Sequence, residues 1–231
     1  MGEGRIESRI GDMFFRGKEI PISESDYVSV AMPPVIDKPF GEMTKKEALS
    51  IFAWFMENLD ARIHNMCVYL QFEGDYTPES LIPLWDCVMK SYKTKPVEEF
   101  YTIKTCIGLY LAETLRHQYP QLKWECQLKG RKDLIEKNRP VLKGFYLENG
   151  VSVGFEPAFV LQVQSQRLYD DEADKEQLIR VFEKWANKIP GVVVKSPRED
   201  PRKHKGRFVI MDDSGKKEPI VYDELPEWLL R

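Results

Sequence analysis

The sequence has no long apolar run, and its first residues lack an apolar segment. No stretch approaches the roughly 18 to 20 apolar residues that a membrane-spanning helix needs, which argues against a membrane protein of that type. The stretch M-G-E-G-R-I-E-S-R-I is charged where a secretory signal peptide requires an apolar centre. We therefore expect a cytoplasmic protein without a membrane partner.

An excess of charge of one sign is also missing. The chain has 34 Lys and Arg against 37 Asp and Glu, for a formal net charge of -3. Because nucleic-acid-binding domains usually carry a strong basic excess, this balance argues against nucleic acid as the main partner. A hydrophobic content of 42% over 231 residues is typical of a globular protein with a substantial core.

Cysteine and histidine are scarce. The four cysteines, Cys67, Cys87, Cys106 and Cys126, form no C-x-x-C motif, and each lies among apolar neighbours. We interpret them as reduced, buried thiols that act as small hydrophobic residues. A metal site needs three or four ligands, and three histidines in the whole chain show no ligand spacing. We expect neither a metal nor another cofactor.

Signature motifs of the commonest enzyme classes are absent as well. The chain contains no G-x-G-x-x-G or G-x-x-x-x-G-K-[ST] loop, no G-x-S-x-G and no H-E-x-x-H. The sequence therefore gives no motif support for a nucleotide-binding protein, a hydrolase of that type or a zinc protease. Because many enzymes lack such motifs, the question of catalysis stays open.

Two long helices and a strand are the clearest elements that the sequence contains. Thr44-Lys45-Lys46-Glu47 forms a capping box, and apolar residues at three- and four-residue steps continue as far as Leu70. Pro96 and Pro120 bracket a second helix. After Pro120, residues 122–128 alternate between apolar and polar side chains, which predicts a strand with one buried face. This helix and strand are expected to organise the core.

The second half of the chain reads mainly as strands. Asn149-Gly150 predicts a hairpin turn between strands at 141–146 and 151–155. Leu161 and Val163 alternate with glutamines, which predicts another strand within 158–168. Further elements are expected in this order: a helix at 175–188, a short strand at 192–194 and a C-terminal hairpin at 207–222.

These elements predict an α+β protein, with an N-terminal helical layer (44–118) packed on a mainly antiparallel sheet. The predicted domains are an N-terminal arm laid over the body, an α+β core domain, and a C-terminal hairpin extension packed on that core. Their ranges are 1–43, 44–190 and 191–231. Two small domains divided near Lys129 form the alternative.

Three motifs carry a resemblance to a known family. They are M-T-K-K-E-A from Met43, F-x-W-F from Phe52, and Y-T-P-E-S-L-I-P-L-W from Tyr76. With these motifs, the middle half of the chain resembles a family of uncharacterised bacterial proteins. The resemblance implies a bacterial, cytoplasmic protein and carries no catalytic or binding residues with it. Most residues of these motifs are helix caps and core residues, which indicates that the motifs reflect the fold of the family more than a chemical activity.

One polar constellation stands out on the second long helix. Cys106, Tyr110, Glu113 and His117 follow at steps of four, three and four, which places them on one stripe. Glu113 lies among apolar neighbours, where a carboxyl group can act as a general acid or base. We take the candidate pocket to comprise Tyr110, Glu113, His117, Trp124 and Arg139. The alternative is a structural pair of Glu113 and His117 on the wetter edge of the helix.

A basic segment lies near the C-terminus. Residues 195–207 carry six Lys or Arg against two acidic residues. The candidate contact residues are Arg198, Arg202, Lys203 and Lys205, which could bind phosphate or an acidic partner. A solvated loop between two strands is the simpler interpretation.

The leading functional hypothesis is a non-catalytic module that binds another protein, as an inhibitor, an immunity-type antidote or a regulatory adaptor. Five tryptophans and ten tyrosines could supply aromatic anchors for such an interface. The alternative is a small-molecule enzyme or sensor with a pocket around Glu113 and His117.

Overall fold

The computed structural model describes residues 27–35, 38–94, 97–131, 134, 136–169, 173–194, 198, 207–211 and 217–221. Backbone contacts divide the chain into two units, Met1–Lys195 and Ser196–Arg231. The residues on both sides of Lys129 belong to the first unit. None of the helices in the described part is long and apolar enough to cross a membrane.

The α+β class predicted from the sequence is confirmed. The described helices of the first unit are η2 (Phe40–Glu42), α2 (Lys45–Leu70), η3 (Pro78–Ser80), α3 (Leu81–Thr94), α4 (Val97–Gln118), α5 (Pro157–Tyr169) and α6 (Gln177–Ala186). Its strands are β1 (Lys123–Cys126), β2 (Pro140–Tyr146) and β3 (Ser152–Phe155), which form an antiparallel sheet in the order β1-β2-β3.

α2 begins where the capping box predicts. The Glu47 amide donates to the Thr44 hydroxyl oxygen at 3.3 Å, and the Thr44 amide donates to the Glu47 carboxylate at 2.7 Å. Two of the four unpaired N–H groups at the helix start are thereby satisfied. The helix then runs unbroken to Leu70 and ends at Gln71, which adopts a left-handed conformation.

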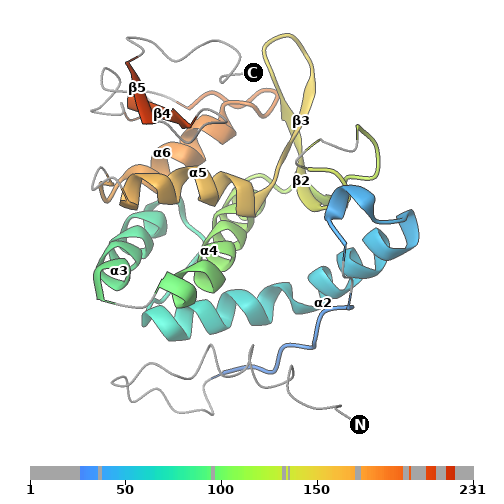
Figure 1. Ribbon diagram of the computed structural model, residues 1–231, viewed down its shortest axis with the longest axis horizontal. Helices are drawn as coiled ribbons and strands as arrows, with labels where there is room; N and C mark the ends of the chain where they lie inside the picture. Colours follow the sequence, from blue (N-terminus) through green and yellow to red (C-terminus); the bar gives the residue numbers. More distant parts are fainter. Residues whose placement is uncertain are drawn as a thin grey trace. The chain divides into compact units, whose positions relative to one another are not determined.

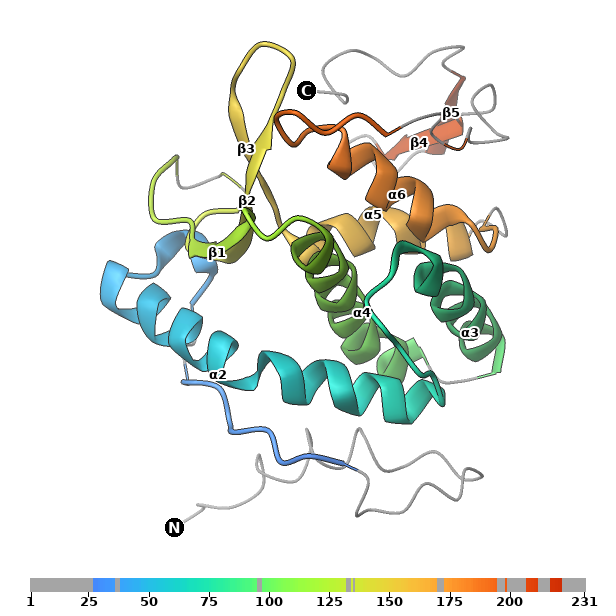
Figure 2. The same cartoon turned by 180° about the vertical axis from the view of Figure 1, so that it is seen from behind.

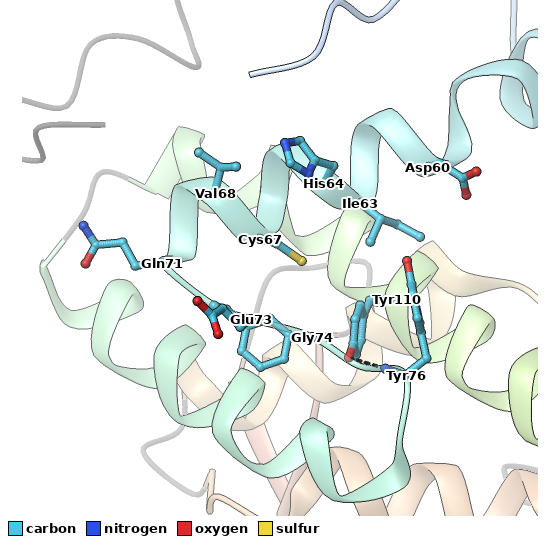
Figure 3. A pocket seen from close by; sticks show the side chains of 11 residues that line it. Asp60, Ile63, His64, Cys67, Val68, Gln71, Glu73, Gly74, Tyr76 and Tyr110 are labelled. Atoms are coloured by element: carbon cyan, nitrogen blue, oxygen red, sulfur yellow. Dashed lines mark hydrogen bonds between the residues drawn. The ribbon is translucent and has the colours of Figure 1, made fainter. Parts of the chain in front are cut away.

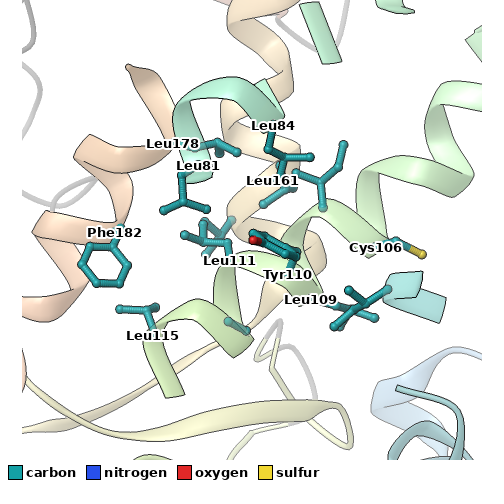
Figure 4. Close-up of a cluster of buried hydrophobic side chains, with 14 of the residues drawn as sticks. Leu81, Leu84, Cys106, Leu109, Tyr110, Leu111, Leu115, Leu161, Leu178 and Phe182 are labelled. Carbon is teal, nitrogen blue, oxygen red and sulfur yellow. The ribbon is translucent and has the colours of Figure 1, made fainter. Parts of the chain in front are cut away.

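α4 is the helix around which the others pack. It contacts α2, α3, α5 and α6, and Figure 1 shows it between α2 and α5. Ile107, Leu111 and Leu115 are completely buried along it. Figure 4 shows the resulting apolar cluster, in which side chains from α3, α5 and α6 surround those of α4. A helix covered on so many sides holds the position of the buried groups that it carries.

A glycine permits the close crossing of α4 and α5. A Cβ added to Gly108 would lie 2.5 Å from the Pro157 carbonyl oxygen and 3.0 Å from the Pro157 Cβ. These distances are shorter than van der Waals contact, so only glycine fits at this point of α4. The crossing holds α5 against the central helix.

The three-stranded sheet closes one end of the helical core. Leu142, Phe145 and Phe155 are completely buried and belong to the same cluster as the helices. The predicted Asn149-Gly150 hairpin is confirmed, and Gly150 has the positive φ of 78° that such a turn favours.

The strand predicted at 158–168 is wrong, because this segment is helix α5. Pro157 occupies its first turn, and the Glu156 carboxylate accepts the Phe159 amide. The buried residues include Val160, Leu161, Ser165 and Leu168, at helical spacing, whereas Gln162 and Val163 are exposed. Apolar and polar residues alternate by chance over four positions, and packing against α4 selects the helix.

The strand predicted at 192–194 is also wrong, since these residues form no ladder. In this segment the Val194 amide instead donates to the Asn187 side chain. The second unit contains the predicted C-terminal hairpin, with β4 (Arg207–Met211) paired antiparallel to β5 (Lys217–Val221). Its packing on the core stays a prediction.

Candidate functional site

Glu113 is buried in a structural ion pair. Its carboxylate accepts two hydrogen bonds from Arg116 Nε, at 2.9 and 3.0 Å, and one from Arg116 Nη2 at 2.5 Å. The Trp124 indole N–H also donates to Oε1 at 2.6 Å, and His117 Nε2 lies 3.9 Å from Oε2. Both carboxylate oxygens are therefore occupied, and the group ties α4 to β1.

Arg139 has different contacts from the other four members of the predicted pocket. Its guanidinium lies over the Phe40 ring, 4.5 Å from the centroid, and 3.6 Å from the Glu156 carboxylate. Glu156 is buried, and this burial raises the pKa of its carboxyl group. Arg139 therefore joins η2 to the start of α5.

Tyr76, which is not among the predicted pocket residues, joins Tyr110 and His117. The Tyr76 ring stacks on Tyr110 at a centroid distance of 4.9 Å and on His117 at 4.4 Å. The Tyr110 hydroxyl accepts the Tyr76 amide at 3.1 Å and lies 2.7 Å from Ser80 Oγ. Three aromatic rings thus form a continuous stack beside α4.

The backbone at Tyr76 is unusual. Its φ of 56° falls in the left-handed region, which costs a non-glycine residue about 1–2 kcal/mol. The stack, the hydrogen bond to Tyr110 and a bond from Gln118 Nε2 to the Tyr76 carbonyl hold this conformation. Strained residues of this kind concentrate at functional sites, which directs attention to the space beside Tyr76.

An open groove of about 810 Å³ lies there, between α2, the segment that follows it and α4 (Figure 3). Its lining consists of Asp60, Ile63, His64, Cys67, Val68, Gln71, Phe72, Glu73, Gly74, Tyr76 and Tyr110. Of the predicted pocket residues, only Tyr110 lines the groove. A Cβ at Gly74 would lie 2.5 Å from the Tyr110 hydroxyl, so a glycine is needed where this segment passes Tyr110.

Two side chains that line the groove beside Tyr110, the Cys67 thiol and the Tyr76 hydroxyl, are held in their neutral forms. Burial raises the pKa of Cys67 to about 11, and the neighbouring Cys106 thiol adds to this effect. Burial also raises the pKa of Tyr76 to about 12, with further contributions from Cys67, Glu113 and Asp60. The groove therefore contains no activated thiolate or phenolate at neutral pH.

We expect iodoacetamide to alkylate Cys67 at least about tenfold more slowly in the native protein than in the urea-unfolded chain at pH 8. The reason is the smaller thiolate fraction, which outweighs the higher nucleophilicity of a thiolate with a raised pKa. Mass spectrometry of the peptide that contains Cys67 measures the rate. The native rate should continue to rise above pH 10, and a plateau below pH 9 would contradict the assignment.

A second candidate site lies on another face of α2, where residues 27–35 run beside the helix (Figure 2). The Val28 amide donates to Asn65 Oδ1 at 2.8 Å, and Asn65 Nδ2 donates to the Val28 carbonyl at 2.9 Å. The Ala31 amide donates to Asn58 Oδ1 at 2.8 Å, and the Trp54 indole N–H donates to the Ala31 carbonyl at 2.7 Å. Val28 and Ala31 are thus bound to α2 through their backbone groups, and the extent of the predicted arm (1–43) stays a prediction.

The predicted basic loop falls mostly outside the described residues. Arg198 is described and half-buried, whereas Arg202, Lys203 and Lys205 lie outside the described part. Within the described residues, no group of three or more His, Cys, Asp or Glu side chains could hold a metal ion.

Three comparisons tested this chain for similarity to known proteins. They covered protein-family models, curated protein sequences and solved structures. None of the three found a match.

Proposed function

We propose that this chain is a non-catalytic protein-binding module that acts as an inhibitor, an immunity-type antidote or a regulatory adaptor. The observation that carries the proposal is the row of polar side chains on α2, Trp54, Asn58 and Asn65, bound to the backbone of an extended segment. Side chains that satisfy the main-chain groups of an extended segment provide a general way to hold a peptide.

The state of Glu113 agrees with this proposal. A general base needs a free lone pair facing the substrate, whereas the Glu113 oxygens accept hydrogen bonds from Arg116 and Trp124. The resemblance to bacterial proteins and the cytoplasmic location remain predictions that are compatible with such a role.

Purification of the tagged full-length chain from its own host, followed by quantitative mass spectrometry, tests the proposal. We expect one protein to be retained in stoichiometric amount. The same purification should be made with a Val28→Pro/Ala31→Pro variant, in which the α2 side chains are released from the internal segment. Recovery of the bare chain in both cases would contradict a protein-binding function.

A small-molecule sensor or enzyme is the second candidate, and the groove beside Tyr76 favours it. The strained Tyr76 backbone and the volume of about 810 Å³ support a ligand site there. Neither Glu113 nor His117 lines the groove, so a ligand would contact Asp60, Tyr76 and Tyr110 instead. A metabolite that raises the melting temperature of the full chain, but not of an Asp60→Ala variant, would support this function.

A further inference from the structure

We infer that Trp54, Asn58 and Asn65 form a binding site for an extended peptide segment of a partner, and that residues 27–31 are a displaceable internal ligand of that site. We call these three side chains the asparagine face. The inference rests on the proposed protein-binding function and specifies both the partner's chemistry and its competition with the chain's own segment.

The geometry of the asparagine face matches an extended backbone. Asn58 and Asn65 are seven residues apart on α2, which corresponds to a rise of about 10 Å. Val28 and Ala31 are three residues apart, and three extended residues also span about 10 Å. The two amide side chains therefore bind two residues, three positions apart, of an extended segment that runs antiparallel to the helix.

Both asparagines are buried, and one is oriented before it meets the segment. Asn58 is 5% exposed, and its Nδ2 donates to the Trp54 carbonyl at 2.8 Å, which leaves Oδ1 aimed at the segment. Asn65 is 8% exposed and uses both of its amide atoms on Val28. The Arg62 guanidinium lies 5.3 Å from the Trp54 ring centroid and packs on the indole. Such fixed polar groups are typical of a formed binding site.

The four hydrogen bonds of the asparagine face contact the backbone of the segment and not its side chains. Val28 and Met32 are 49% and 59% exposed, and Ser29 and Ala31 are also exposed, although Val28 and Ala31 carry all four hydrogen bonds. A partner segment therefore needs free N–H groups at two positions three residues apart. Proline is excluded at both positions because it has no N–H. Most other extended sequences satisfy this requirement.

The internal segment is held weakly enough to be displaced. The net contribution of one hydrogen bond to stability is similar in size to the entropy cost of fixing one backbone residue. No side chain of residues 27–35 is fully buried, which limits the apolar area that adds to this balance: Val28, Met32 and Val35 are exposed, and Tyr27, Val30, Pro33 and Pro34 are partly buried. A longer partner segment that also buries side chains would therefore compete effectively.

Fluorescence anisotropy with a labelled peptide tests the inference on the full chain. The probe is the peptide of residues 27–35, Y-V-S-V-A-M-P-P-V, and the control peptide carries proline in place of Val28 and Ala31. We expect the Val28→Pro/Ala31→Pro chain to bind the probe at least about tenfold more tightly than the unaltered chain, whose tethered segment competes. The control peptide should bind at least about tenfold more weakly.

Variants of α2 locate the binding. Adding Asn58→Ala and Asn65→Ala to the proline variant should weaken binding of the probe at least about tenfold. The matched control Glu57→Ala, an exposed neighbour on the same helix, should leave it unchanged. No saturable binding to the folded proline variant would overturn the inference, and so would equal binding of both peptides.

Two further measurements keep the inference testable if the proline variant does not fold. In the unaltered chain, the Val28 and Ala31 amides should exchange hydrogen more slowly than in an unfolded peptide, and Asn58→Ala should accelerate exchange at Ala31. Exchange at unfolded rates would overturn the inference. Light scattering should show a monomer. If the chain were instead a dimer that the Val28→Pro/Ala31→Pro exchange dissociates, the asparagine face would bind a second copy of this chain and not a partner protein.

The two proposals fail separately. A stoichiometric partner that still binds after Asn58→Ala/Asn65→Ala would leave the protein-binding function standing and remove the asparagine face as its site. If the probe bound specifically but no partner were retained from the host, the asparagine face would stand as a peptide site and the proposed protein-binding function would not.

Discussion

Replacing Glu113 by alanine is expected to lower the free energy of unfolding by about 2–4 kcal/mol. The carboxylate is 2% exposed and accepts hydrogen bonds from Arg116 and from the indole of Trp124. Its removal leaves the Trp124 N–H without its acceptor and the Arg116 charge without its partner. Because Arg116 is 42% exposed, water can solvate the guanidinium, which keeps the expected loss below that of a fully buried pair. Urea denaturation measures the change.

Two variants separate the contributions to this loss. Glu113→Gln keeps an oxygen that can accept from Trp124 but removes the charge, so we expect roughly half of the loss. Glu57→Ala removes an exposed helical carboxylate and should change stability by less than about 0.5 kcal/mol. If Glu113→Ala were as stable as the unaltered chain, the ion pair would have no structural role, and a function for this carboxylate would have to be reconsidered.

Replacing Gly108 by alanine is expected to destabilise the protein by about 1–3 kcal/mol, although alanine is the better helix former. The new Cβ would lie 2.5 Å from the Pro157 carbonyl oxygen, 2.9 Å from its carbonyl carbon and 3.0 Å from its Cβ. Two of these atoms are backbone atoms of α5 and cannot move as a flexible side chain would. The helices must therefore separate, and thermal or urea unfolding should detect the loss.

An alanine-to-glycine substitution at an exposed helical position is the control for Gly108→Ala. Ala53 is exposed on α2, and Ala53→Gly should cost about 1 kcal/mol through helix propensity alone. The protein should thus be more stable with glycine at position 108 of α4 and with alanine at position 53 of α2. Stabilisation by Gly108→Ala would show that the α4–α5 crossing tolerates a methyl group.

The elements that sequence alone determined are those whose hydrogen bonds join close neighbours. The capping box joins Thr44 to Glu47, and the Asn149-Gly150 turn joins strands that follow each other directly. α4, with its apolar stripe and the proline after it, belongs to the same class. A pattern of three to seven residues specifies such features, so the α+β class was predictable.

α5 shows where local pattern becomes insufficient. Residues 158–168 alternate as a strand over four positions, yet Leu161, Ser165 and Leu168 face the core as a helix. A short apolar run satisfies both periods, and its partner in space decides between them. That partner is Gly108 on α4, about fifty positions earlier in the chain.

The candidate sites were decided by tertiary structure. Glu113 was recognised as a polar group in an apolar stripe, but its acceptor role toward Trp124 depends on how β1 packs against α4. In the sequence, Asn58 and Asn65 are ordinary polar positions of α2. Their partners are Ala31, which lies 27 residues from Asn58, and Val28, which lies 37 residues from Asn65. Periodicity shows that a side chain leaves the core face, whereas only the folded chain shows what meets it there.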